Sequence, residues 1–73
     1  SKTTIEFTLS NTEFVTLSIY DITGKQLKTI LTKKLSKGNH KINWNAEGLN
    51  EGIYFIRLET NINSIVQKVI ILN

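Results

Sequence analysis

Apolar and polar residues alternate along most of the chain, which is the pattern of half-buried β-strands. Ile5, Phe7 and Leu9 share one parity near the N-terminus, with polar side chains between them. The same period of two recurs over residues 15–20. Successive side chains of a strand point to opposite faces, so each segment predicts a strand with one apolar face.

Further segments continue the pattern, at about 25–32, 40–44, 53–59 and 64–72. In the first of them, Leu27 and Ile30 stand three positions apart, so the alternation changes phase between them. One extra residue in a strand flips every later side chain to the other face, and this segment therefore predicts a β-bulge.

Short strands about ten residues apart, each bounded by turn residues, are typical of an all-β sandwich. Six strands are readable and a seventh could lie in 31–36 or 45–50, which predicts an antiparallel β-sandwich of about seven short strands. The long connection 45–52 suits a crossover between two sheets. The shared parities predict a core of Phe7, Leu17, Ile19, Ile42, Trp44, Tyr54, Ile56 and Leu58.

The chain has 73 residues, which predicts one small domain over 1–73. Chains near this size bury only about 60% of their unfolded surface, which leaves little room for a deep substrate cleft. The sequence contains no cysteine, so neither a disulfide nor a thiolate metal site stabilises the fold. These properties favour a domain that is not an enzyme and holds no cofactor.

The termini point to a longer precursor. No apolar run approaches the ~20 residues of a transmembrane segment. The start, residues 1–4, lacks the apolar core of a signal peptide, and the first strand follows almost at once. We therefore expect the domain to be a piece of a longer protein that carries any export signal elsewhere.

Positive charge is concentrated in the middle of the chain, although the net charge is only +3. A span without acidic residues contains Lys25, Lys28, Lys33, Lys34, Lys37 and Lys41. No aromatic residue is interleaved with these lysines to stack on bases, and the chain has a single arginine. Lysines that protect edge strands from aggregation give the same pattern. The sequence therefore predicts no nucleic-acid partner.

The stretch IYDITGKQL, residues 19–27, resembles two catalytic loops but fits neither. A phosphate-binding loop needs glycine at the position of Ile19 and a hydroxyl at that of Gln26. A proton-sharing aspartate pair is excluded because Asp21 is the only aspartate. A hairpin turn explains the stretch better: Asp21 accepts backbone hydrogen bonds and Gly24 supplies the positive φ of a type I turn with a G1 bulge.

Other candidate chemical residues favour structural roles. His40, the only histidine, shares the parity of Ile42 and Trp44, which predicts a half-buried structural side chain. Asn43, Asn45 and Glu47 alternate like the start of a calcium loop, but the aspartates and the closing glutamate are missing. Trp44 is expected in the core rather than as an exposed sugar platform. We predict neither catalytic residues nor a metal site.

Three ordered motifs carry a resemblance to a known family. They are I-Y-D-x-x-G ending at Gly24, then G-x-H-x-x-x-W from Gly38 to Trp44, then L-x-x-G-I-Y ending at Tyr54. In this order and spacing, the chain from Ile5 to Leu72 resembles the C-terminal sorting domain (type A) of the bacterial type IX secretion system.

The resemblance implies an immunoglobulin-like β-sandwich at the C-terminus of an exported protein. A passenger domain would precede it, pass through the periplasm and cross the outer membrane through the type IX translocon. A sortase-like peptidase would usually remove the domain, leaving the passenger at the cell surface or outside. By position, the implied recognition residues are Gly52, Tyr54, Lys68 and the tail Val69, Ile70, Ile71, Leu72 and Asn73. The structural turn residues are Asp21, Gly24 and Gly38.

A second hypothesis comes from a different class. The flagellar hook-capping protein has an immunoglobulin-like insert with a similar pattern, so the motifs also suit a non-catalytic structural or adhesive module. Such a module could be a spacer beside a catalytic domain or an assembly part. Fold alone does not distinguish the two hypotheses.

Overall fold

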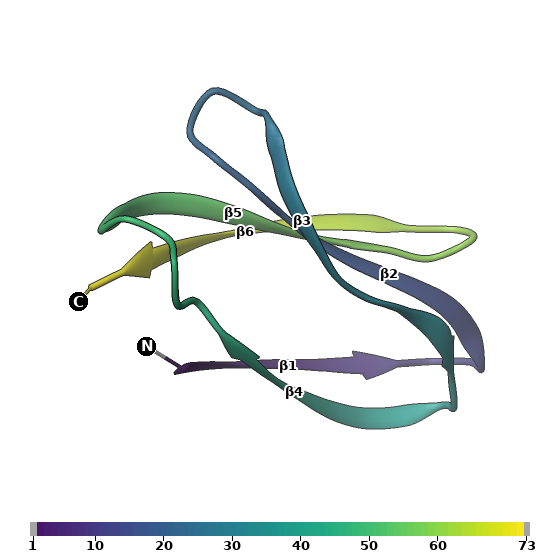
Figure 1. The fold of residues 1–73 in the computed structure, drawn as a ribbon. Helices are drawn as coiled ribbons and strands as arrows, with labels where there is room; N and C mark the ends of the chain where they lie inside the picture. The colour runs from purple at the N-terminus through teal and green to yellow at the C-terminus, as the bar shows by residue number, and fades with distance from the viewer. Residues whose placement is uncertain (1, 73) are drawn as a thin grey trace.

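The computed structural model describes residues 2–72 and contains six strands (Figure 1). No helix occurs in this part of the chain. The strands are β1 (Lys2–Leu9), β2 (Glu13–Tyr20), β3 (Gln26–Leu35), β4 (Gly38–Asn45), β5 (Gly52–Glu59) and β6 (Ser64–Ile71).

The strands form two antiparallel sheets. One sheet has two strands in the order β1-β4, and the other has four in the order β3-β2-β5-β6. In Figure 1 the small sheet lies below the large one as a second layer. The predicted all-β antiparallel sandwich is therefore confirmed, with six strands instead of about seven. β3 continues to Leu35 without a break, and residues 46–51 form a turn between strands, so neither proposed segment adds a seventh strand.

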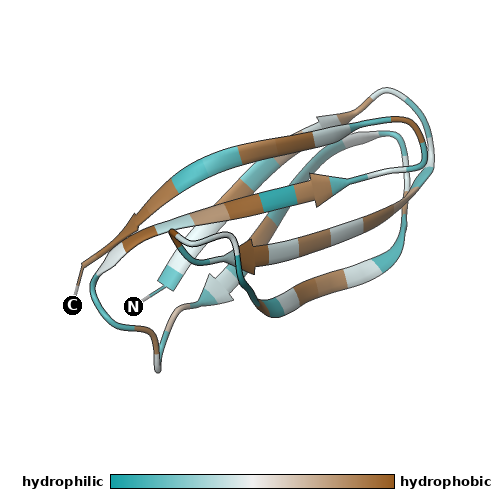
Figure 2. Ribbon diagram, turned by 90° about the horizontal axis from the view of Figure 1, so that it is seen from above, coloured by the Kyte–Doolittle hydropathy of each residue, from teal (hydrophilic) through white to brown (hydrophobic). Residues whose placement is uncertain are grey.

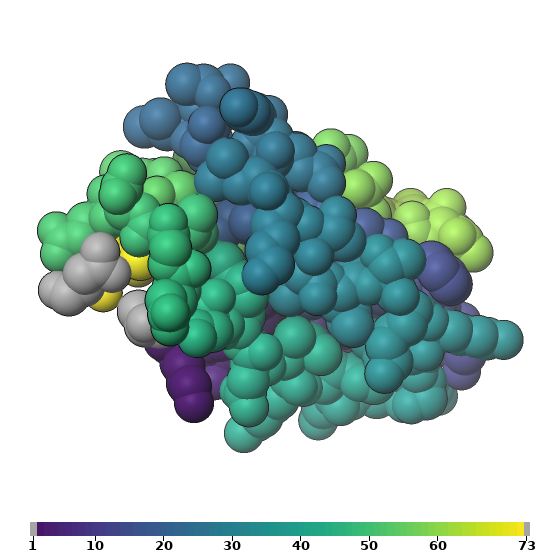
Figure 3. Space-filling model, viewed as in Figure 1, coloured from purple at the N-terminus to yellow at the C-terminus, as the bar shows by residue number. Residues whose placement is uncertain are grey.

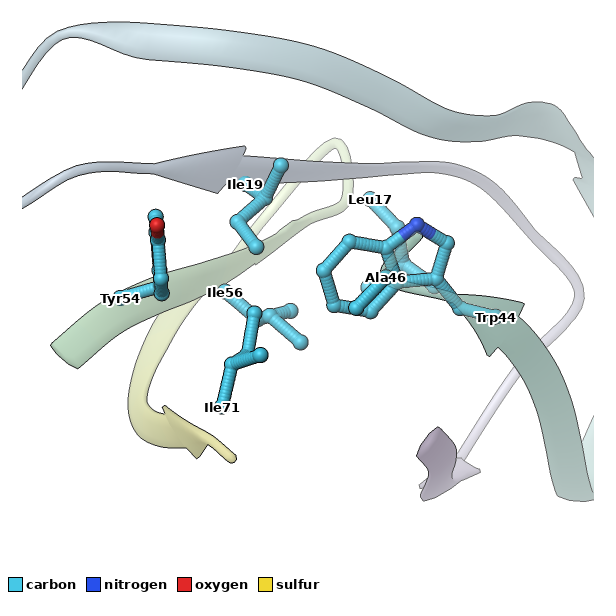
Figure 4. Close-up of a cluster of buried hydrophobic side chains, with 7 residues drawn as sticks. All are labelled: Leu17, Ile19, Trp44, Ala46, Tyr54, Ile56 and Ile71. Carbon is cyan, nitrogen blue, oxygen red and sulfur yellow. The ribbon is translucent and has the colours of Figure 1, made fainter. Parts of the chain in front are cut away.

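The alternation of side chains builds the core between the sheets. Bands of apolar and polar residues follow one another along the strands in Figure 2. The buried cluster, drawn in Figure 4, comprises Leu17, Ile19, Trp44, Ala46, Tyr54, Ile56 and Ile71. A second buried cluster comprises Leu9, Val15 and Leu35. In the space-filling view of Figure 3, atoms of β3 and β4 close over the front of the molecule.

The predicted core is confirmed, because all eight of its residues are buried or pack against the buried cluster. Five of its eight residues, Leu17, Ile19, Trp44, Tyr54 and Ile56, are buried. The other three, Phe7, Ile42 and Leu58, are partly buried and pack against them. Burial of a large aliphatic side chain contributes about 1.5–3 kcal/mol, so these residues account for much of the stability of a small domain.

The predicted bulge in β3 is present, and there are two. The pairing of β2 with β3 shifts between Leu17 and Ser18, where Ile30 has no direct partner, and between Ile19 and Tyr20, where Leu27 has none. Each extra residue restores the phase of the strand after it. The three-residue spacing of Leu27 and Ile30 in the sequence therefore reflects two separate irregularities.

Three connections carry the chain from one sheet to the other. The segment 46–51 between β4 and β5 does so, as its length predicts, and residues 10–12 and 36–37 do so in very short turns. The Tyr54 hydroxyl donates a hydrogen bond of 2.7 Å to the Asn50 carbonyl and so ties the longer connection to β5. Ala46, the first residue of this connection, is buried.

Candidate functional site

The loop that follows β2 is a tight hairpin turn. The backbone N–H of Gly24 donates to the Asp21 carbonyl at 3.0 Å, and the Asp21 N–H donates to the Lys25 carbonyl at 2.9 Å. Gly24 has a φ of +90°, as a type I turn with a G1 bulge requires.

The Asp21 carboxylate has its hydrogen bonds within this turn. One oxygen, Oδ1, accepts from the Thr23 hydroxyl at 2.6 Å and from the backbone N–H of Thr23 and Lys25 at 2.9 and 3.0 Å. The hydrogen bond from the Thr23 hydroxyl, followed by that from the Lys25 N–H, lowers the pKa of Asp21 below its usual value. A carboxylate engaged in this way organises the turn.

His40 is held by two structural contacts. Its Nε2 lies 2.6 Å from the Ser36 carbonyl, and its ring stacks on Phe7 with a centroid distance of 5.5 Å. The side chain is half-buried, as expected. Asn45 caps its own loop, because its Oδ1 accepts from the backbone N–H of Glu47 at 3.0 Å. Across residues 2–72, no group of three or more acidic or histidine side chains could hold a metal ion.

The family-derived residues come together where β5 pairs with β6. Gly52 lies opposite Ile71, Tyr54 opposite Val69, and Phe55 opposite Lys68. The hairpin turn before β6 fixes this register, because the Thr60 Oγ1 accepts from the Asn63 N–H at 3.0 Å and the Thr60 N–H donates to the Asn63 carbonyl at 2.8 Å. Residues 13 to 19 positions apart in sequence thus form one surface region, which we call the β5–β6 end.

Burial separates the residues of this end into two kinds. Tyr54 and Ile71 are buried in the core, and the Ile71 side chain is only 2% exposed. Ile70 and Leu72 are 59% and 71% exposed, and Lys68 is also exposed. The segment expected as a recognition tail is therefore mostly part of β6. Asn73 lies outside the described residues.

Sequence reasoning missed further exposed apolar residues next to this end. Ile65 and Val66 of β6 are more than half exposed. On the outer face of the large sheet, Tyr20, Ile22, Phe55, Arg57 and Val66 are among the residues that line a hollow of about 240 Å³. The sequence of residues 64–71 places apolar side chains on both faces of β6. It does not show that both faces stay partly exposed in the folded domain.

The predicted basic span spreads over several elements. Lys28, Lys33 and Lys34 lie on β3, and Lys41 on β4 is 3.4 Å from Glu6 of β1 in an exposed ion pair. β3 and β6 are the two edge strands of the large sheet. This position fits the edge-protecting role that lysines often have.

The fold and the β5–β6 end define a small β-sandwich module whose last strand, β6, carries three apolar residues that are more than half exposed, Ile65, Val66 and Ile70. A family model described as the secretion system C-terminal sorting domain matches residues 1–72. The chain belongs to this family, which confirms the resemblance that the three motifs indicate. The domain is the C-terminal sorting signal of type IX secretion, and the structural or adhesive module is not favoured.

Sorting domains of this kind imply a passenger on the N-terminal side, type IX secretion machinery as partner, and a secreted protein that ends at the cell surface or outside. No curated protein and no solved structure gave a significant match. Among the described residues, no helix is long and apolar enough to cross a membrane.

Proposed function

We propose that the type IX machinery recognises this domain in the periplasm through its β5–β6 end. The passenger then crosses the outer membrane through the translocon, and a sortase-like peptidase removes the domain. The observation that carries the proposal is the family match over residues 1–72. In this account the domain binds the secretion machinery and presents the passenger to it, and it catalyses no reaction.

The geometry suggests how the work is divided within the β5–β6 end. Gly52 and Tyr54 begin β5 and pair with the last residues of β6, while Ile71 packs in the core. These three residues would hold the strand in place. Lys68, Val69, Ile70 and Leu72, continued by Asn73, would form the surface or segment that the receptor binds.

Lys68 is the residue best suited to direct contact. Its side chain is exposed, and among residues 2–72 no carboxylate lies within ion-pair distance of its ammonium group. Its nearest neighbours of the same parity on β6 are Val66 and Ile70, both more than half exposed. A cation framed by exposed apolar side chains can contribute to a partner interface without being required for the fold.

The proposal is tested with a reporter that carries an N-terminal export signal and ends in residues 1–73. Lys68→Ala should strongly reduce the fraction of reporter that reaches the cell surface, while Lys34→Ala on the opposite edge should not. A lone exposed charge rarely contributes more than about 1 kcal/mol to stability, so both purified variants should melt close to the parent. Normal surface display of a folded Lys68→Ala fusion would remove Lys68 from the recognition site.

A further inference from the structure

The two edges of the large sheet differ in how they are protected from further pairing. β3 has two bulges and carries Lys28 and Lys33 opposite the buried Ile19 and Val15. Directly opposed residues in an antiparallel pair share a face, so these lysines stand on the core-facing side of the edge. Bulges and inward-pointing charges are among the devices that prevent strand addition, as are other lysines on an edge strand.

β6 has neither a bulge nor an inward-pointing charge; its one charged side chain, Lys68, has the opposite parity to its core-facing residues. It pairs with β5 over eight residues without a register shift, and among the described residues its only strand neighbour is β5. Its core-facing positions, which lie opposite Leu58, Ile56, Tyr54 and Gly52, hold the uncharged side chains of Ile65, Gln67, Val69 and Ile71. On an edge strand, about half of the backbone N–H and C=O groups point away from the sheet and can pair with another strand.

The core-facing side of β6 also has unfilled space. A hollow of about 370 Å³ lies between β6 and β1, with Gln67, Val69, Thr3 and Ile5 in its lining. Ile65, on the same side of β6, is 59% exposed although it is a large apolar residue. A strand placed beside β6 would cover Ile65 and direct an inward side chain toward this hollow.

We propose that an extended segment of the secretion machinery adds to the free edge of β6 as a fifth strand of the large sheet. It places an apolar side chain in the hollow beside β1 and an acidic side chain next to Lys68, the only charged residue of β6. Backbone pairing supplies the affinity in this mode, and pockets for alternate side chains supply the specificity. The inference rests on the proposed function and specifies how the partner is bound.

A second copy of the chain is a poorer occupant of the same edge. Two β6 strands related by a two-fold axis must pair residues of equal parity, because directly opposed side chains point to one face. The registers with the greatest overlap then place Lys68 directly or diagonally across from the Lys68 of the other copy. Like charges at such positions destabilise a sheet, whereas a partner with a carboxylate there is complementary.

The test introduces into β6 an inward-pointing charge like those of Lys28 and Lys33 in β3. Ile65→Lys places an inward-side charge on the free edge opposite Leu58, and Ile65→Thr changes the same side chain without adding charge. In the reporter fusion, Ile65→Lys should abolish surface display and Ile65→Thr should retain it. Thr32→Lys adds the same charge to β3 and should leave display unchanged. Melting curves of the purified variants establish that each remains folded.

Each outcome bears on the proposal. Normal display of folded Ile65→Lys overturns strand addition while the proposed function stands. An equal loss of surface display with Thr32→Lys would attribute the effect to the added charge alone and would also overturn strand addition. If Ile65→Lys does not fold, Lys68→Glu decides, and normal display of that variant overturns the acidic contact. A wild-type domain that sediments as a β6-dependent dimer makes the second copy the occupant instead. A wild-type fusion that stays in the periplasm contradicts the proposed function, and the docking proposal falls with it.

Discussion

The turn at Asp21 shows how much a few residues can specify through local interactions. The side chain of Asp21 accepts hydrogen bonds from residues two and four positions ahead, and Gly24 closes the turn with a φ of +90°. Every partner lies within five residues, so the pattern of the sequence was sufficient to predict the turn. The same residues account for a loop that resembles a catalytic site as a structural turn.

The lowered pKa of Asp21 predicts a pH dependence of stability. Because the folded protein favours the carboxylate, the stabilisation is fully present above the ordinary aspartate pKa of about 3.9 and is lost as the pH falls through the lower folded-state value. The difference in unfolding free energy between the wild type and Asp21→Asn should therefore shrink as the pH is lowered below about 4. Urea titrations at several pH values measure this difference, and a difference that does not change with pH would contradict the assigned role.

Substitution of Gly24 isolates backbone strain from steric overlap. A Cβ atom at this position would meet nothing within 4 Å, so any loss comes from the positive φ. Gly24→Val should destabilise the domain by more than about 1 kcal/mol. Gly24→Asn should cost clearly less, because asparagine tolerates the left-handed region. Equal stabilities of the two variants in chemical denaturation would show that the turn does not require this conformation.

At the scale of the element, β6 shows where sequence reasoning reaches its limit. The last three residues of β6, Val69 to Ile71, and the following Leu72 are all apolar, so alternation cannot indicate which side chains face the core. The register with β5 decides the matter by placing Ile71 opposite Gly52, where it enters the core, and by leaving Ile70 and Leu72 exposed. Pairing between strands is a non-local property, and a single sequence does not encode it in a local pattern.

This register predicts a large loss of stability for one of two neighbouring isoleucines and a small loss for the other. Ile71→Ala should cost about 2–5 kcal/mol, because it removes a fully buried side chain. Ile70→Ala should change stability by no more than about 0.5 kcal/mol, because that side chain is mostly in solvent. Thermal and chemical denaturation of the two purified variants tests the pair. Similar losses in both would mean that β6 pairs in another register.

β3 could be predicted only in part for a related reason. The three-residue spacing of Leu27 and Ile30 indicated one bulge, and the structure has a bulge at each of these residues. The phase changes twice, so the two shifts partly cancel in the sequence pattern. Lys28 and Lys33 acquire their edge-protecting positions only through this irregular pairing.

At the scale of the whole molecule, the fold class followed from composition and alternation, but the order of the strands did not. The large sheet places β2 between β3 and β5, and two of the three crossovers between sheets occur in turns of two or three residues. Nothing in such short segments distinguishes a crossover from a hairpin. The missing seventh strand has the same origin, because residues 31–35 extend β3 instead of starting a new strand.

The topology also decides which parts of the domain can act as a signal. The chain folds so that β6 becomes an edge with neither a bulge nor an inward-pointing charge, while the opposite edge is bulged and carries several lysines. The ends of β5 and β6 are paired, so the exposed residues of the β5–β6 end, which we propose as the recognition site, lie on a folded scaffold. Recognition should therefore require the folded sandwich as well as the sequence of its last residues.

The most direct test of this account is a transplant of the domain onto an unrelated passenger. Residues 1–73 are fused to the C-terminus of a folded reporter with an N-terminal export signal and expressed in a type IX-competent bacterium. We expect most of the reporter at the cell surface or in the medium, and we expect the Ile71→Ala fusion to be displayed less in proportion to its unfolded fraction. A wild-type fusion that is folded and full-length but remains in the periplasm would contradict the account.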